Sequence, residues 1–255
     1  MSDQIITIDQ GNYRTEHICC AIGNDPENRQ RADSKREWLA SQFEHGLVFK
    51  RLDERGKVFI EYQPIENAWK PLIGQNMLVI NCLWVSGRFK GQGIAARLLE
   101  TCLEDARRQD KSGVAVVSAS TKKAFLTDKS FFTAYGFATC DSALPWFELL
   151  FLPLKADAVP PSFTKRARSG NGGNPAGFTF VYSRQCPFME SVVADMAAQA
   201  AARGHPCETI RLESAAQARE IGSPFGTLGI WWRGRLLTHE LMPADKFAKL
   251  LDGLA

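Results

Sequence analysis

An apolar strand ends in a glycine-rich loop and a helix begins within one stretch of the chain, which reads Val85-Ser86-Gly87-Arg88-Phe89-Lys90-Gly91-Gln92-Gly93-Ile94-Ala95-Ala96-Arg97-Leu98-Leu99. The first N–H groups of a helix have no partner within the helix, and the helix dipole is positive at that end. Glycine lets a phosphate approach these groups closely. The stretch therefore predicts an anion site that is made mainly by the backbone. An ordinary glycine-rich turn between a strand and a helix is the alternative.

The flanking sequence predicts a mixed sheet around this loop. Apolar strands are expected at residues 77–85 and 114–118, on either side of a helix at 94–109. Upstream, a helix at 29–45 precedes a hairpin with strands at 47–52 and 58–62. Downstream, a helical stretch at 130–134 precedes an aromatic-rich strand at 146–152. The order strand, helix, strand predicts an α/β fold, in the α+β sense of a mixed sheet, with a crossover in its middle.

Two segments resemble the GNAT superfamily of N-acetyltransferases. The acetyl-CoA loop of that family reads Q/R-x-x-G-x-G/A, and its three defined positions are filled here by Lys90, Gly93 and Ala95. In this register the next helix has a leucine pair at residues 98 and 99, where the family carries one. A register that starts at Arg88 also satisfies the pattern but misplaces the pair. The segment 131–137, which ends in Gly-Phe, is similar to a later helix of the family.

The resemblance covers residues 1–155 and implies a GNAT N-acetyltransferase domain there. It implies acetyl-CoA as cosubstrate and direct attack by a primary amine of a small molecule or peptide. An oxyanion would be stabilised by a backbone N–H near residues 83–85. The implied cofactor-binding residues are Leu83, Trp84, Val85, Lys90, Gly91, Gln92, Gly93, Ile94, Ala95 and Ala96.

Candidate catalytic side chains are fewer. Many relatives place a tyrosine where this chain has Phe132, so Tyr135 is the remaining candidate acid, with packing as its alternative role. Glu61 lies in an apolar strand and is a candidate base, although a glutamate that faces solvent is the alternative. Cys82 and Asn81 interrupt the central strand, where either side chain is placed to touch the substrate; for Cys82, simple packing is the alternative.

The early segment 16–20 contains His17, Cys19 and Cys20. The resemblance places His17 and Cys20 in the wall of the acceptor pocket. The segment lacks a second spaced pair of ligands, so no metal is expected. The seven cysteines of the chain are an odd number scattered over two predicted cores, which indicates reduced thiols and a cytoplasmic protein.

Composition excludes several classes of partner. The chain has 255 residues, 45% of them apolar, and a net charge of +3 without a long run of like charges. We therefore expect neither nucleic acid nor membrane as partner. Residues 1–10 do not resemble a signal peptide, and eighteen apolar residues never occur together, so we expect no export and no membrane span. Besides the substrate, the partner considered is a second copy of the chain, in a homodimer.

A second domain is expected after a flexible linker at 156–177, which is rich in proline and glycine. Residues 178–255 read as strand, helix, strand, helix, hairpin and helix, which is similar to the thioredoxin fold. Cys186 precedes the first helix of this domain, where a thiolate is favoured, but Met189 replaces the resolving cysteine. Pro224 lies close to the place of the fold's cis-proline.

As a whole the chain resembles bacterial GNAT proteins with a YoaP-like C-terminal domain. The segments that carry this likeness are Phe59-Ile60-Glu61-Tyr62, Asn81-Cys82-Leu83-Trp84-Val85-Ser86-Gly87 and Gln185-Cys186-Pro187-Phe188. Acetyl transfer is the predicted function. Two alternatives stay open: a non-catalytic protein that senses thiols, oxidants or soft metals, and a monothiol oxidoreductase that uses Cys186.

Overall fold

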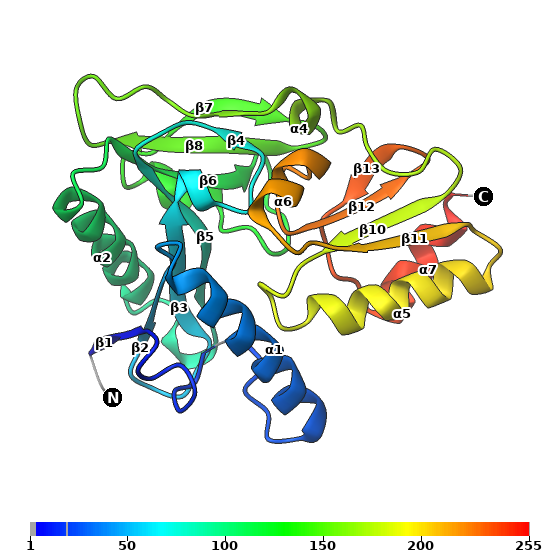
Figure 1. Ribbon diagram of the computed structural model, residues 1–255, viewed down its shortest axis with the longest axis horizontal. Helices are drawn as coiled ribbons and strands as arrows, with labels where there is room; N and C mark the ends of the chain where they lie inside the picture. Colours follow the sequence, from blue (N-terminus) through cyan, green and yellow to red (C-terminus); the bar gives the residue numbers. More distant parts are fainter. Residues whose placement is uncertain (1–3, 19, 255) are drawn as a thin grey trace. The chain divides into compact units, whose positions relative to one another are not determined.

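The computed structural model describes residues 4–18 and 20–254, and these form two compact units (Figure 1). The first unit consists of the residues up to Ala68, Leu72–Ser142 and Trp146–Ser162. The second consists of Phe163–Ala255 together with the short segments Trp69–Pro71 and Ala143–Pro145. Two excursions of the N-terminal sequence therefore belong to the second unit.

The elements follow one another along the chain with short connections. The first are β1 (Ile5–Ile8), α1 (Pro26–Phe43), β2 (Val48–Leu52), β3 (Val58–Pro64), η1 (Ile65–Asn67), β4 (Leu72–Ile73), β5 (Met77–Val85), η2 (Gly87–Phe89), α2 (Ile94–Arg108), β6 (Gly113–Ala119), α3 (Lys129–Thr133), β7 (Ala138–Ala143) and β8 (Phe147–Pro153). The remainder are β9 (Ser162–Phe163), α4 (Lys165–Ser169), β10 (Phe178–Tyr182), α5 (Met189–Ala202), β11 (Cys207–Arg211), α6 (Ala215–Ile221), β12 (Leu228–Trp232), β13 (Arg235–Thr238) and α7 (Ala244–Asp252).

The first unit is built on a seven-stranded sheet in the order β1-β2-β3-β5-β6-β8-β7. Strands β5 and β6 are parallel and α2 crosses between them, whereas β2, β3 and β5 run antiparallel, as do β6 and β8. The predicted mixed sheet with a central crossover is confirmed.

The two faces of this sheet differ in chemistry. Alternate residues of β3, among them Ile60 and Tyr62, join Leu98 and Leu99 of α2 in one apolar core. Because side chains alternate along a strand, Glu61 points to the opposite face. Helix α1 covers that face, where Lys35 contacts Glu61 and lies 5.8 Å from the centre of the Phe49 ring.

A bulge in β5 opens the sheet beside the glycine-rich loop. Glu61 is paired with Cys82 and Tyr62 with Ile80, so Asn81 is an extra residue between the two pairs. The parallel pairing of β5 with β6 is recorded only from Met77 to Ile80, although β6 stays paired with β8 to its end. Strands β5 and β6 therefore separate at Asn81, and the gap is a place where a ligand can meet the edge of β5.

The second unit contains a four-stranded sheet in the order β11-β10-β12-β13. Strand β10 runs parallel to β11 and antiparallel to β12, and β12 and β13 form a hairpin. The predicted order of strands and helices is present, and the thioredoxin-like assignment stays a prediction. Within 156–177 the structure has β9 and α4, and Phe163 and Ala167 are fully buried, because these apolar residues find a core that the proline and glycine content conceals.

Candidate active site

The glycine-rich loop has the backbone conformation of an anion cradle. Helix α2 begins at Ile94, no side chain caps it, and its first turn contains no acidic residue. Gly87, Gly91 and Gly93 have φ angles of +60°, +75° and +73°, and a β-carbon at any of them would meet no atom within 4 Å. The N–H groups of the first turn thus lie next to open space, which fits a phosphate.

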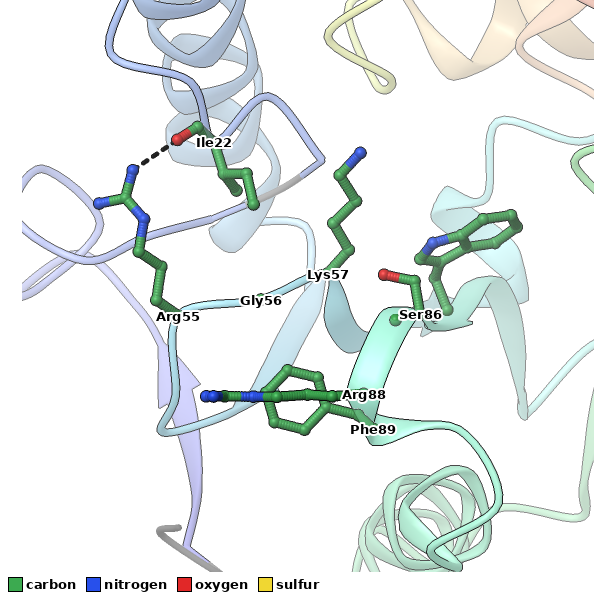
Figure 2. A pocket seen from close by; sticks show the side chains of 9 residues that line it. Ile22, Arg55, Gly56, Lys57, Ser86, Arg88 and Phe89 are labelled. Atoms are coloured by element: carbon green, nitrogen blue, oxygen red, sulfur yellow. Dashed lines mark hydrogen bonds between the residues drawn. The ribbon is translucent and has the colours of Figure 1, made fainter.

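The turn between β2 and β3 holds this loop in place. Gly56 lies so close to the buried Phe89 that an added β-carbon would come within 2.5 Å of the ring. The N–H of Ser86 donates to the carbonyl of Lys57 at 3.1 Å. Arg88 is paired with Glu54, with 3.1 Å between Nη2 and Oε2, and its guanidinium covers the Phe89 ring (Figure 2). The loop therefore depends on an adjacent hairpin for its position.

A pocket of about 370 Å³ lies between this hairpin turn and the end of β5 (Figure 2). It is lined by Ile22, Arg55, Gly56, Lys57, Trp84, Ser86, Gly87, Arg88 and Phe89. Arg55 donates to the carbonyl of Ile22 at 2.6 Å, which ties the segment before α1 to the turn. Trp84 is 40% exposed, so its ring forms an accessible wall.

His17 packs against the outside of the same turn. Its Nε2 lies 2.8 Å from the carbonyl oxygen of Gly56. Burial lowers the pKa of His17, and the nearby charges of Arg51, Arg55 and Arg36 lower it further, against the hydrogen bond with Gly56, which raises it. His17 is therefore a neutral group near pH 7. The predicted companion Cys20 is half-buried, and Cys19 lies outside the described residues.

Glu61 belongs to a buried polar cluster beneath the bulge. Its side chain is 1% exposed and its Oε2 lies 2.5 Å from Nζ of Lys35, whose side chain is 3% exposed. The alternative of a glutamate that faces solvent is wrong, because β3 is covered on both faces. Lys35 also lies 4.4 Å from the centre of the Trp38 ring. A pair with so little exposure keeps its full charge interaction.

A chain of amides in this cluster fixes the orientation of Asn81. Gln63 donates from Nε2 to the carbonyl of Asn67, so its Oε1 needs a donor. Nδ2 of Asn81 donates to that Oε1 at 3.1 Å and also lies 3.4 Å from Oε1 of Glu61. Its Oδ1 is consequently the end of the chain, and within residues 4–18 and 20–254 this buried atom has no hydrogen-bond partner. Asn81 therefore presents an unused acceptor where β5 and β6 separate.

The gap between β5 and β6 is bordered by polar backbone. The carbonyl of Leu83 accepts a hydrogen bond of 3.0 Å from Oγ1 of Thr127, in the loop after β6. Cys82 and Trp84 share the face of Glu61, because the pairs of β3 and β5 place them opposite Glu61 and Phe59. Three predicted site residues, Glu61, Asn81 and Cys82, are thus brought together on one face.

Tyr135 does not belong to this group. Phe132 is fully buried, whereas Tyr135 follows the end of α3 and is 41% exposed. Its ring lies 5.2 Å from that of Phe131. The expected divergence of the two positions around the helix is confirmed, and the role of Tyr135 as acid stays a prediction.

In the second unit, Cys186 is half-buried and its carbonyl accepts from the N–H of Met189, the first residue of α5. The cis peptide bond found in the described part of the chain precedes Pro145, so Pro224 is not the cis-proline that the fold comparison suggested. The loop around Pro224 is shaped instead by Gly226, whose φ is +97°.

Sequence reasoning missed Lys35, which is decisive for Glu61. Its signal is visible in retrospect, since Lys35 shares helical spacing with the buried Trp38, Leu39 and Gln42. It also missed a second buried cluster on the α2 face, where Asp105 accepts from the hydroxyl of Tyr62 and pairs with Lys50 at 2.9 Å.

Two searches of the described residues complete the picture. Nowhere in them do three side chains with metal-binding groups gather in one place. Across the same residues, each helix is either too short or too polar to cross a bilayer.

Comparison with known proteins gives a match in each part of the chain. Residues 12–137 match the Acetyltransferase (GNAT) family, and residues 206–249 match a family described as YoaP-like. A protein of Bacillus subtilis (strain 168), named as the uncharacterized N-acetyltransferase YoaP, is 38% identical over 250 residues, which are 98% of this chain and 99% of that protein.

Solved structures give more distant likenesses. A GNAT family acetyltransferase from Brucella melitensis, crystallised with acetyl-CoA, is 14% identical and has a TM-score of 0.39, with 64% of this chain and 96% of that chain covered. The ribosomal-protein-S18-alanine N-acetyltransferase of Escherichia coli is 11% identical, also with a TM-score of 0.39, and covers 62% of this chain and 98% of its own.

Proposed function

Since the chain belongs to the GNAT acetyltransferase family, in the group whose members carry a YoaP-like C-terminal region, we propose that it transfers the acetyl group of acetyl-CoA to a primary amine by direct attack. The observation that supports this proposal most is the agreement of two independent features. The glycine-rich loop has the geometry of a diphosphate site, and β5 separates from β6 at its end.

Acetyl-CoA fits the features of the loop. Its diphosphate would accept hydrogen bonds from the N–H groups at Gly93, Ile94, Ala95 and Ala96, and the three glycines leave room for it. Lys90 is exposed beside the loop and supplies a positive charge. The acyl chain would then follow the edge of β5 toward Asn81, because this edge has no recorded pairing with β6 beyond Ile80.

A backbone N–H of β5 is the proposed oxyanion donor. The carbonyl of Leu83 accepts from Thr127, in the loop after β6, so it points into the gap. In an extended strand the N–H and the carbonyl of one residue point to the same side. The N–H of Leu83 is thus available to a thioester oxygen, and a fixed donor of this kind stabilises the tetrahedral intermediate without reorganisation.

The acceptor amine would dock at Asn81. Its orphan Oδ1 accepts one N–H of the amine, which satisfies a buried atom that has no other partner in the described chain. Glu61 lies beside it and remains the candidate base, which would take a proton through a water molecule. Tyr135 remains the candidate acid for the CoA thiolate.

A coupled assay tests this proposal. Purified protein is incubated with acetyl-CoA and a panel of primary amines, and both free thiol and N-acetylated product are measured. We expect thiol release that depends on the amine and an equal amount of acetylated product. Asn81→Leu should raise KM for the amine by about tenfold, because the lost acceptor is worth about 1.4 kcal/mol. Thiol release without any acetylated amine would refute the proposal.

A further inference from the structure

We propose that the pocket beside the β2–β3 turn is an anion subsite for the acceptor, with Lys57 as its main ligand, so that the preferred acceptor carries a carboxylate or phosphate in addition to its amine. This inference rests on the proposed acetyl transfer and adds a substrate class to it. No residue of this pocket outside β5 was singled out as a site by the sequence.

The charges that line the pocket are of one sign. Arg55, Lys57 and Arg88 are among its nine lining residues, and none of the nine is acidic. Arg88 is compensated by Glu54. Arg55 is held by neutral oxygens, those of Ile22 and Asn24 at 2.6 and 3.2 Å, so its charge is oriented but not neutralised.

Lys57 is the cation best placed for a ligand. It is half-buried, and in the described part of the chain its ammonium has neither an ion pair nor a side-chain hydrogen bond. Figure 2 shows its side chain rising from the turn on the side of Ile22, whereas Arg88 and Phe89 lie on the other side. A half-buried ammonium without an anion is unfavourable compared with one that is paired, so the pocket favours an anionic ligand.

The positive potential has an independent sign in His17. This imidazole contacts Gly56 at the centre of the turn, and three arginines, Arg55 among them, contribute to lowering its pKa. His17 stays neutral and does not compete for the anion. Its Nε2 also holds the carbonyl of Gly56, which fixes the turn from the side opposite Phe89.

The position of the pocket makes the acceptor the expected source of the anion. Trp84 is one wall of the pocket, and on β5 it shares the face of Cys82 and Glu61 rather than that of α2. Lys57 lies four residues before Glu61 on the same stretch of chain, which is about 13 Å at 3.3 Å per residue. An extended peptide with its amine at Asn81 would cover that span with about four residues.

Two matched peptides test the inference. Both have a free N-terminus and an amidated C-terminus, and they differ only in glutamate or glutamine at the third and fourth residues. With saturating acetyl-CoA, the wild-type protein should show a kcat/KM about tenfold higher for the glutamate peptide, the size expected for a half-buried charge pair. Lys57→Gln should reduce this preference to below about twofold through KM. Lys111→Gln, which removes a lysine charge at the far end of α2, should keep it.

A binding measurement separates this inference from the proposed function. Calorimetric titration of the glutamate peptide into CoA-saturated protein does not require turnover, and the Lys57→Gln variant should bind about tenfold more weakly. Equal binding of both peptides to the wild-type protein, or a preference that survives in Lys57→Gln, overturns the inference. Weaker acetyl-CoA binding by Lys57→Gln, with the peptide preference intact, would assign Lys57 to a CoA phosphate and also overturn it. Absence of acetylation with every amine would refute the proposed function alone.

Discussion

Replacing Glu61 by glutamine should destabilise the first unit strongly, because it leaves the buried ammonium of Lys35 without its anion. The two side chains are 1% and 3% exposed and their charged atoms are 2.5 Å apart. Removal of one partner from a buried pair costs about 3 to 5 kcal/mol. Lys35 keeps its contact with the Trp38 ring at 4.4 Å, which retains part of its stabilisation, so we expect a loss near 3 kcal/mol.

The double variant Lys35→Met/Glu61→Gln separates the charge effect from packing. It removes both charges and nearly keeps both shapes, so its loss should be about 1 kcal/mol, well below the sum of the single losses. The free energy of unfolding is measured in urea at pH 7 by circular dichroism. Glu100→Gln is the matched control, since Glu100 pairs with Arg107 at 2.9 Å but both side chains are about half exposed. This control should change stability by less than about 1 kcal/mol.

Two results would contradict this reasoning. A loss for Glu61→Gln as small as that of Glu100→Gln would mean that water reaches the pair. Strict additivity in the double variant would mean that the two charges do not interact.

Further predictions concern the second polar cluster and the second unit. Burial raises the pKa of Asp105, but its hydrogen bond with Tyr62 and neighbouring cations lower the pKa further, so the net pKa is depressed. Its contribution to stability is present above the unfolded pKa of about 3.9 and is lost as pH falls through the folded value, so Asp105→Asn should flatten the acid limb of a Tm profile below about pH 4; an unchanged limb would contradict this. Gly226→Ala should destabilise by more than about 2 kcal/mol, because its φ is +97° and the new carbon would lie 2.1 Å from a backbone oxygen, whereas Gly204→Ala, at +82° with no atom within 4 Å, should cost about 1 kcal/mol in the same urea titration. Cys186→Ser should leave the acetylation rate intact, and a fall of more than about tenfold, 1.4 kcal/mol, would show that the second unit takes part in catalysis.

The elements next to the loop were predictable because their signals are local. Strand β5 has the predicted bounds and α2 ends one residue early, since an apolar run, glycines and helical periodicity lie within one stretch of sequence. Strand β7 was not predicted. It is an edge strand in which mostly polar residues are exposed or half-buried, so it lacks the apolar alternation by which strands are recognised.

The chemistry of the site depends on pairings between distant residues, and these were not predictable. Glu61 is suspicious in an apolar strand, but its partner Lys35 is 26 residues away on another element. The bulge at Asn81 is a property of the register between two strands, and the sequence of one strand does not reveal it. The linker was inferred from composition, whereas order at Phe163 and Ala167 comes from burial in a tertiary core.

The most direct test of the account is calorimetric titration of acetyl-CoA into four proteins: the wild type, Gly93→Asp, Gly93→Asn and Gly204→Asp. Gly93 and Gly204 have similar φ angles, +73° and +82°, and open space around them, so the backbone strain of the substitution is shared. If backbone N–H groups at residue 93 bind the diphosphate, Gly204→Asp binds like the wild type and Gly93→Asp binds at least about a hundredfold more weakly than Gly93→Asn, which is 2.7 kcal/mol. Equal affinities of Gly93→Asp and Gly93→Asn would contradict the account.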